Sequence, residues 1–150
     1  MSYVKVTNDE AEIYSIGHLR RDNPNVSFPR NPSNELLAKW DVYPLEVKPE
    51  PSKDDLTETT AIRDPELVDG KWIRDWDVNK LEENAASAKV RMKRNEILET
   101  KVDTINPLRW EAMDEMEKEL WKNYRQKLLD LPLQTGFPFS VSWPVSPTGE

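Results

Sequence analysis

The sequence predicts an α+β protein: a small N-terminal antiparallel β domain of sandwich-like form, then a C-terminal helical hairpin with an extended aromatic tail. Two observations predict this class. Before residue 79, most of the 12 prolines separate short segments in which apolar and polar residues alternate, as in strands. After residue 79, apolar residues recur at every third or fourth position, which indicates helices. We therefore expect a β-rich domain at 1–78 and an α-helical domain at 79–150.

Alternation predicts strands at Tyr3–Val6 and Val42–Val47, with a short helix at Asn34–Trp40 between them. The pair Asp69-Gly70 predicts a hairpin turn, because glycine tolerates the positive φ that such turns require. The residues that alternate beyond this turn are Trp72, Arg74, Trp76 and Val78.

Two helices are expected in the C-terminal half. The first begins near Asn79, and its apolar face consists of Leu81, Ala85, Ala88 and Met92. Asn106 and Pro107 resemble an N-cap followed by a proline at the first helical position, so the second helix starts there. It runs to about Asp130 and ends before Pro132. One broad apolar face of this helix contains Trp110, Met113, Leu120, Tyr124 and Leu128, with Met116 and Trp121 beside it.

The aromatic tail begins at Phe137. Its large apolar residues occupy every second position as far as Val145, which predicts an extended strand with one apolar face. Pro138 and Pro144 both remove N–H donors from the same edge of this strand, so it is expected to pair on one side only. We expect the tail to pack its aromatic face on the helices or along a neighbouring chain.

Composition excludes several classes of function. A net charge of −7 argues against binding to a nucleic-acid backbone. There is no cysteine for a disulfide, a thiolate metal site or a nucleophile, and no cofactor motif such as a P-loop. No apolar run approaches the roughly 20 residues of a membrane span. The first residues lack the layout of a secretory signal, which favours synthesis in the cytoplasm.

Catalytic residues are not evident. His18 is the only histidine, and no relay partner adjoins it in the sequence. Asp75 and Asp77 are candidates for a glycosidase-type carboxylate pair. Residues two apart on a strand point the same way, however, so we expect both to face solvent.

The C-terminal sequence "WKNYRQKLLDLPLQTGFPFSVSWPVSP" resembles the signature of phage tail fibre assembly proteins, the tail assembly chaperones. In that family a helix of the form W-x-x-Y-R-x-x-L-x-x-L-P leads into G-F-P…V-x-W-P-x-x-P. Upstream, "KVRMKRNEIL" is similar to the basic helix that precedes it. The matching positions are Trp121, Tyr124, Arg125, Leu128, Leu131, Pro132, Gly136, Phe137, Pro138, Val141, Trp143, Pro144 and Pro147.

The resemblance implies a protein that is not an enzyme and needs no cofactor or metal. It implies a chaperone that binds a phage tail fibre protein, covers its distal region and assists its folding and trimerisation. A homo-trimer matching the fibre's threefold symmetry is expected, acting in the host cytoplasm during assembly or remaining on the virion tail. The N-terminal part varies in this family, so we expect it to fit the particular fibre.

These expectations assign two sets of residues. The candidates for fibre binding are Trp72, Trp76, Arg20 and Arg21. The candidates for partner or oligomer binding are Trp110, Met113, Leu120, Trp121, Tyr124, Arg125, Leu128, Phe137, Phe139, Val141 and Trp143.

Two other functions compete with the chaperone. One is a structural tail or fibre accessory protein retained in the virion, which needs the same apolar surfaces. The other is a small carbohydrate-active enzyme, which needs a cleft with paired carboxylates. The apolar face of the second helix is likewise open to two interpretations: it packs on the β domain, or it serves self-association or binding of a protein partner.

Overall fold

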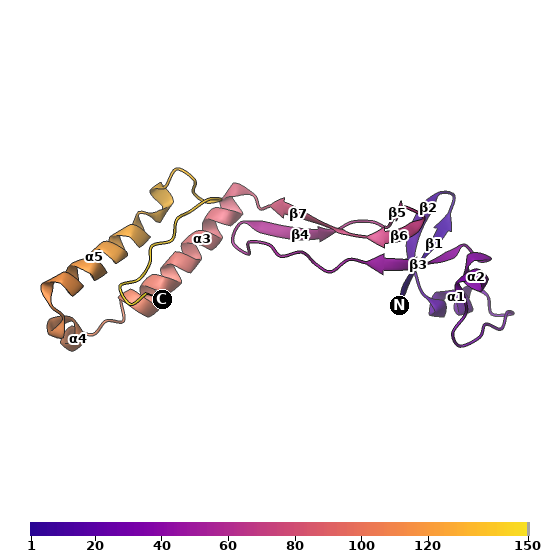
Figure 1. The fold of residues 1–150 in the computed structure, drawn as a ribbon, viewed down its shortest axis with the longest axis horizontal. Coiled ribbons are helices and arrows are strands. Elements are labelled where there is room, and N and C mark those ends of the chain that lie inside the picture. The colour runs from indigo at the N-terminus through magenta and orange to yellow at the C-terminus, as the bar shows by residue number, and fades with distance from the viewer. Residues whose placement is uncertain (150) are drawn as a thin grey trace. The chain divides into compact units, whose positions relative to one another are not determined.

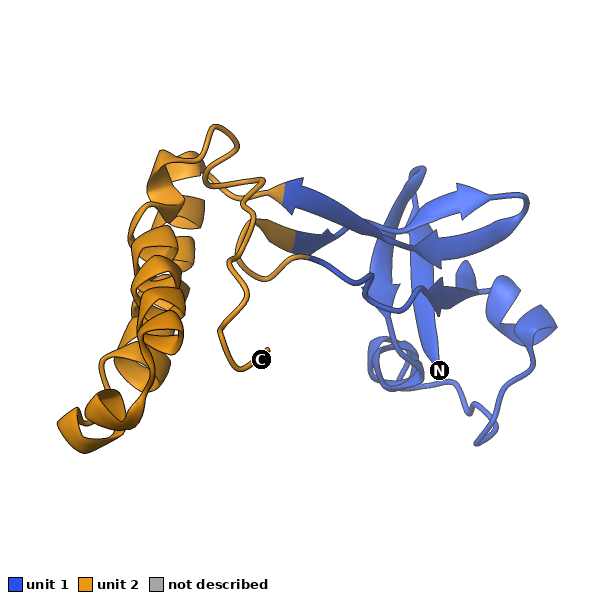
Figure 2. Ribbon diagram, turned by 60° about the vertical axis from the view of Figure 1, so that its left-hand side comes forward, with its two compact units in different colours: residues 1–53, 60–79 blue, residues 54–59, 80–150 orange. Residues whose placement is uncertain are grey.

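The computed structural model describes residues 1–149 and divides into two compact units. Residues 1–53 and 60–79 form the N-terminal unit, and residues 54–59 and 80–150 form the C-terminal unit (Figure 2). A strand-rich N-terminal part is followed by helices, so the predicted α+β class is confirmed (Figure 1).

One five-stranded sheet dominates the N-terminal unit. Its order is β2-β1-β3-β6-β5, so β2 and β5 are the edge strands. The pairs β1–β2, β1–β3 and β5–β6 are antiparallel, but β3 and β6 run parallel, so the sheet is mixed rather than wholly antiparallel. The long connection between β3 and β6 makes a parallel return possible. The strands are β1 (Ser2–Thr7), β2 (Glu10–Tyr14), β3 (Val42–Val47), β5 (Glu66–Val68) and β6 (Lys71–Arg74).

Both hairpins of this sheet close through two-residue turns. Asp69 and Gly70 have φ values of 48° and 76°, as the hairpin prediction required. The β1–β2 hairpin, which alternation did not reveal, turns at Asn8 and Asp9 with φ values of 51° and 66°. Positive φ at both positions matches the right-handed twist of the strands, and Asn and Asp tolerate it better than most residues.

Two short helices cover one face of the sheet. These are α1 (Ile16–Asp22), which the sequence did not predict, and α2 (Asn34–Ala38), which it did. Ser15 and Ser33 cap them by accepting hydrogen bonds from the His18 and Leu36 N–H groups. Their buried leucines pack against the sheet, and the resulting core cluster contains Tyr14, Leu19, Leu37 and Val42.

A separate two-stranded sheet pairs β4 (Glu58–Ile62) with β7 (Trp76–Lys80). The boundary between the two units falls within both of these strands. After β7, the Leu81 N–H donates to the Thr57 carbonyl at 2.8 Å, which joins the start of the helical segment to residues 54–59.

The helices of the C-terminal unit differ in two ways from the expected pair. The first, α3 (Glu83–Ile97), continues into a π-helical turn, η1 (Leu98–Val102). The second is broken into α4 (Pro107–Ala112) and α5 (Glu115–Leu129), and a 3₁₀ turn, η2 (Leu131–Leu133), follows. No helix within residues 1–149 is long and apolar enough to cross a membrane.

Capping residues account for these boundaries. The Asn106 side chain accepts a hydrogen bond from the Arg109 N–H, and Pro107 occupies the first turn of α4, as predicted. The break before α5 arises because Asp114 and Glu117 form a capping box, each side chain accepting from the other residue's N–H. The Asp-x-x-Glu spacing in the sequence is the signal for this second start.

The buried face of α3 is not the one that the spacing suggested. Leu81 precedes the helix, and Ala85, Ala88 and Met92 are exposed. Ala86 and Val90 are buried instead, and the same stripe continues to Leu98. Because alanines occupy positions 85, 86 and 88, several faces of the helix look equally apolar in the sequence. The buried face is the one that carries Val90, which has a larger apolar side chain than the alanines.

Residues from η1 and α5 form the core of the C-terminal unit. The buried cluster contains Leu98, Val102, Trp121, Tyr124 and Leu128. Trp121 and Tyr124 meet edge to face, with ring centroids 6.0 Å apart. Trp110, Met113 and Trp143 pack against this cluster from α4, the α4–α5 junction and the tail.

The tail is not a β-strand, so that prediction is wrong. Residues 137–140 form a turn, closed by a 2.7 Å hydrogen bond from the Ser140 N–H to the Gly136 carbonyl. The side-chain amide of Gln134 hydrogen-bonds to both backbone groups of Ser142: it accepts from the N–H at 2.7 Å and donates to the carbonyl at 2.9 Å. The two prolines lack donors, and Ser142 is already paired within the unit, so little remains for sheet pairing.

We predict that Leu128→Ala lowers the free energy of unfolding by about 2–5 kcal/mol, because it opens a cavity in the helical core. Leu128 is fully buried, whereas the adjacent Leu129 is 36% exposed. Leu129→Ala is therefore the matched control and should cost about 1 kcal/mol or less. Urea denaturation followed by tryptophan fluorescence measures both; equal losses would contradict the assigned core.

Candidate functional site

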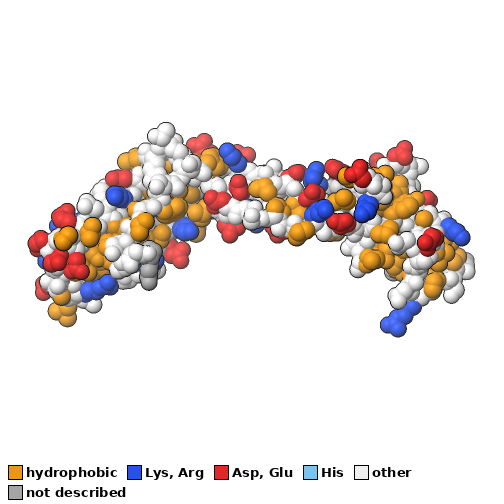
Figure 3. Space-filling view, in the orientation of Figure 1, with side chains coloured by type: hydrophobic (Ala, Val, Ile, Leu, Met, Phe, Trp, Pro, Cys, Tyr) orange, Lys and Arg blue, Asp and Glu red, His pale blue; other side chains and the backbone are white. Residues whose placement is uncertain are grey.

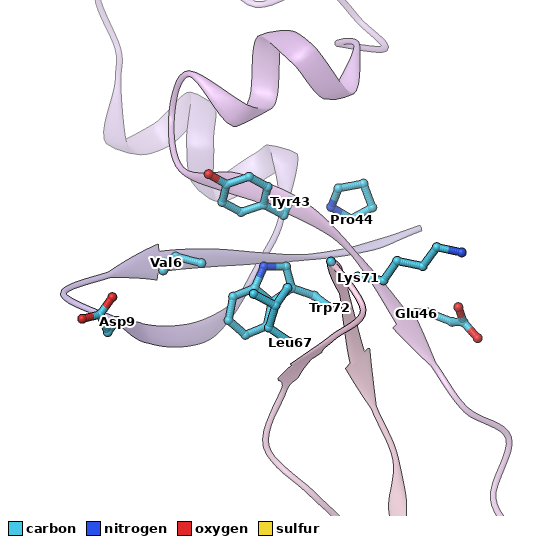
Figure 4. A pocket seen from close by; sticks show the side chains of 9 residues that line it. Val6, Asp9, Tyr43, Pro44, Glu46, Leu67, Lys71 and Trp72 are labelled. Atoms are coloured by element: carbon cyan, nitrogen blue, oxygen red, sulfur yellow. The ribbon is translucent and has the colours of Figure 1, made fainter.

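The N-terminal sheet carries a hollow of about 890 Å³ that is lined by residues of β1, β3, β5 and β6 (Figure 4). Tyr43 follows the core residue Val42 along β3, so its side chain points to the other face. Trp72 pairs in register with Leu67 of β5 and Leu45 of β3, and cross-strand partners share a face. The apolar lining consists of Val6, Tyr43, Pro44, Leu67 and Trp72.

Charged residues surround this apolar lining. Asp9 lines the hollow at the β1–β2 turn, and Glu46 and Lys71 border it with side chains that extend away from Trp72 and Leu67 (Figure 4). Lys48 donates to the Glu46 carboxylate at 2.8 Å, and this hydrogen bond lowers the pKa of Glu46 and raises that of Lys48. Glu46 is therefore a paired carboxylate at neutral pH, whereas no ion pair of Asp9 occurs within residues 1–149.

The exposed apolar residues here are unusual for so charged a chain. Leu67 is 59% exposed although it belongs to a strand, and it lies against the hollow together with Trp72 (Figure 4). Apolar side chains gather on the visible surface over the strands of this unit (Figure 3). An exposed apolar patch bordered by polar residues is typical of a site that binds another molecule.

The predicted fibre-binding residues occupy different environments. Trp72 lies in the hollow. Trp76 is partly buried and donates its indole N–H to the Lys48 carbonyl at 2.9 Å. Arg20 donates to the carbonyls of Pro29 and Arg30 and so holds the loop before α2, while Arg21 lies 3.8 Å from Asp22. The structure brings none of the other three beside Trp72 in the hollow, and their role in binding remains a prediction.

The predicted partner-binding residues divide by exposure. Trp121, Tyr124 and Leu128 are core residues of the C-terminal unit, whereas Leu120 is 50% exposed. Arg125 is exposed and lies 3.5 Å from Asp103. The remaining positions are partly buried: Trp110, Met113, Phe137, Phe139, Val141 and Trp143. Their assignment to oligomer contacts stays a prediction.

Basic side chains hold the aromatic tail within the C-terminal unit. Arg91 and Lys93 of α3 lie over the rings of Phe137 and Trp143, at 5.4 Å and 5.6 Å from the ring centroids. Lys80 lies 5.5 Å from the centroid of Phe139. These are cation–π distances. The basic cluster of α3 therefore contacts the tail aromatics, and the yellow tail runs beside α3 in Figure 1.

The residues considered for catalysis have structural contacts. The His18 ring lies 5.4 Å from that of Tyr14. Asp75 and Asp77 do point the same way, but they face Arg63, each 3.5 Å from its guanidinium, instead of facing solvent alone. Within residues 1–149, no group of three or more His, Asp or Glu side chains is placed to hold a metal ion.

Sequence reasoning found Trp72 but missed the rest of the hollow. Tyr43, Leu67 and Val6 lie on three different strands, and only the register of those strands brings them together. The available signal was Leu67, an apolar residue in a short strand directly before a hairpin turn.

Residues 87–148 match the model of a family described as phage tail assembly chaperone protein. The matched segment runs from α3 through the tail and contains the whole motif on which the resemblance was based. The resemblance to the tail assembly chaperones is therefore confirmed over this part of the chain. No match was found among curated proteins or among solved structures.

The family match supports a general chaperone role in phage tail assembly. Because this family consists of chaperones, the match also suggests that the protein is not an enzyme. The match lies entirely in the C-terminal unit, so the hollow of the N-terminal unit is outside the matched residues.

We predict that Trp143→Ala lowers the free energy of unfolding by about 2 kcal/mol, because the indole packs on the helical core and beneath Lys93. Val145, two residues further along the tail, is 76% exposed, so Val145→Ala is the control and should change little. Urea titration measures both variants. A Trp143 variant as stable as the wild type would show that the tail does not support this core.

Proposed function

We propose that this protein is a chaperone that binds a phage tail fibre, covers its distal region and assists its folding and trimerisation. The observation that carries the proposal is the match of residues 87–148 to the tail assembly chaperones. In this role the protein acts in the host cytoplasm while the fibre is assembled.

The N-terminal unit supplies a surface suited to a fibre chain. Fibre tips pair strands between chains, and such non-local pairing is slow and leaves apolar strand edges open to aggregation. The hollow around Leu67 and Trp72 offers apolar surface to cover such a segment. It lies outside the family match, which agrees with an N-terminal part adapted to one particular fibre.

The C-terminal unit supplies a surface suited to self-association. Met116 and Leu120 are four residues apart on α5, so they lie on one face of the helix, and they are 72% and 50% exposed. Leu120 also lines a hollow with Met113 and Trp121. Contacts between copies through this face give a homo-trimer that presents three N-terminal units to a trimeric fibre.

We predict that Leu67→Glu reduces the yield of soluble, trimeric fibre at least severalfold on co-expression, because it places a charge in the apolar hollow. Val68→Glu is the matched control: it adds the same charge to the same strand, at a residue that is 44% exposed, alternates with Leu67 and does not line the hollow. The readouts are the soluble fraction and the mass of the fibre by light scattering, with circular dichroism to verify that both variants fold.

The chaperone proposal fails if the fibre is soluble and trimeric without this protein, or if Leu67→Glu acts as well as the wild type. Mass spectrometry of purified particles distinguishes the chaperone from an accessory protein that is retained in the virion. Absence from the particle supports a chaperone that leaves after assembly, and stoichiometric presence supports a virion component.

A second prediction concerns the tail. A chain truncated after Leu133 loses the contacts of Phe137, Phe139 and Trp143 with α3, Lys80 and the core, so oligomerisation and fibre solubilisation should both be lost. A chain that ends at Thr148 keeps these contacts and serves as the control. Size-exclusion chromatography with light scattering measures the oligomer; a truncated protein that still oligomerises and solubilises its fibre contradicts the prediction.

A further inference from the structure

The outer edge of β5 is open for pairing with another strand. β5 is the last strand of the sheet and pairs only with β6. Its three residues, Glu66–Val68, are all exposed. An exposed edge carries unpaired N–H and C=O groups, which another extended chain can bind by strand addition.

The hairpin geometry shows which backbone groups face outward. Val68 and Lys71 flank the two-residue turn, and the pair beside such a turn exchanges both of its hydrogen bonds. The next pair, Leu67 and Trp72, is therefore of the non-hydrogen-bonded kind. The N–H and C=O of Leu67 consequently point away from β6, toward the open edge.

Leu67 thus offers two kinds of contact at one place. Its backbone groups are available at the edge, and its side chain lines the apolar hollow beside Trp72. The other edge strand, β2, presents the outward backbone groups of Ala11 and Ile13 by the same geometry. Neither of these residues lines the hollow. Of these two edge strands, β5 is the one at which outward backbone groups and a side chain lining the hollow belong to the same residue.

The charges specify the side chains that fit. Asp9 lines the same hollow and has no ion pair within residues 1–149. Glu46 is paired with Lys48, and Lys71 extends on the Glu46 side of the hollow, away from Asp9 (Figure 4). The N-terminal unit also carries more carboxylates than basic groups, thirteen Asp and Glu against ten Lys and Arg. An unpaired carboxylate beside an apolar hollow favours a ligand with an apolar side chain and a Lys or Arg nearby.

We propose that an extended segment of the fibre adds as a strand to the outer edge of β5, with an apolar side chain in the hollow and a Lys or Arg side chain against Asp9. This inference rests on the proposed function and specifies the kind of fibre segment that the protein binds. The outward groups of Leu67 give affinity without regard to sequence, and the hollow with Asp9 gives selectivity.

Hydrogen exchange of the full chain, with and without the full-length fibre, tests the strand addition. The Leu67 amide faces solvent in the free protein, so fibre binding should slow its exchange about tenfold or more. The Ala11 and Ile13 amides are the internal control and should not change. Exchange is read by mass spectrometry with fragmentation to single residues.

The charge is tested with Asp9→Asn, which keeps a residue type that tolerates positive φ in the turn. Asp69→Asn is the matched control, since Asp69 also has positive φ in a hairpin turn but does not line the hollow. Asp9→Asn should weaken fibre binding about threefold to fivefold at low ionic strength, as for one exposed ion pair, and should flatten its salt dependence. Asp69→Asn should leave both unchanged.

The outcomes separate this inference from the proposed function. A fibre that binds without protecting Leu67, or that protects Ala11 and Ile13 instead, overturns strand addition at β5 while the chaperone stands. Equal binding by the Asp9 and Asp69 variants overturns the role of Asp9. A fibre that does not bind the wild-type protein at all overturns both.

Discussion

Helices α1 and α2 bury only one face of the N-terminal sheet, and the function proposed here depends on that restriction. Their leucines, Leu19 and Leu37, pack on the face that carries Tyr14 and Val42. On the opposite face Trp72 lines a hollow of about 890 Å³. Only 37% of the residues in the chain are hydrophobic, so few apolar side chains are available to form a core, and those that line the hollow remain outside it. Burial by a partner is the simplest physical reason for leaving the hollow open.

In the C-terminal unit, the apolar face of the helices is covered by the chain's own tail. The unit's buried cluster has five residues, two of which are the aromatic Trp121 and Tyr124 of α5, and Trp143 of the tail packs against it. The tail covers that core without forming a strand, because cations of α3 stack on its rings and Gln134 pairs with Ser142. In the sequence the basic residues of α3 look like a solvent-exposed charged surface. The structure shows that two of them, Arg91 and Lys93, lie over aromatic rings of the tail.

Local signals in the sequence predicted local structure well. Alternation predicted the strand Val42–Val47, and the backbone freedom of glycine predicted the turn at Asp69-Gly70. Asn106 followed by proline predicted the helix cap, because an Asn side chain can accept a hydrogen bond from the first turn. The tail shows the limit of this reasoning, since period-two alternation also fits a chain that turns at residues 137–140. The buried face of α3 was ambiguous among similar alanines. The hollow depends on register between distant strands, which no local pattern encodes.

In the proposed function the two units have different roles, and the family match covers only one of them. Residues 87–148 match the family model and contain the core cluster and two of the three cations on the tail rings, Arg91 and Lys93. The hollow and the open edge of β5 lie in the other unit, outside the match. In the proposed function the C-terminal unit contacts other copies of the chaperone, so these contacts do not depend on which fibre is bound. A strand edge reads any backbone, so adaptation to a new fibre requires changes only in the few side chains around Leu67 and Asp9.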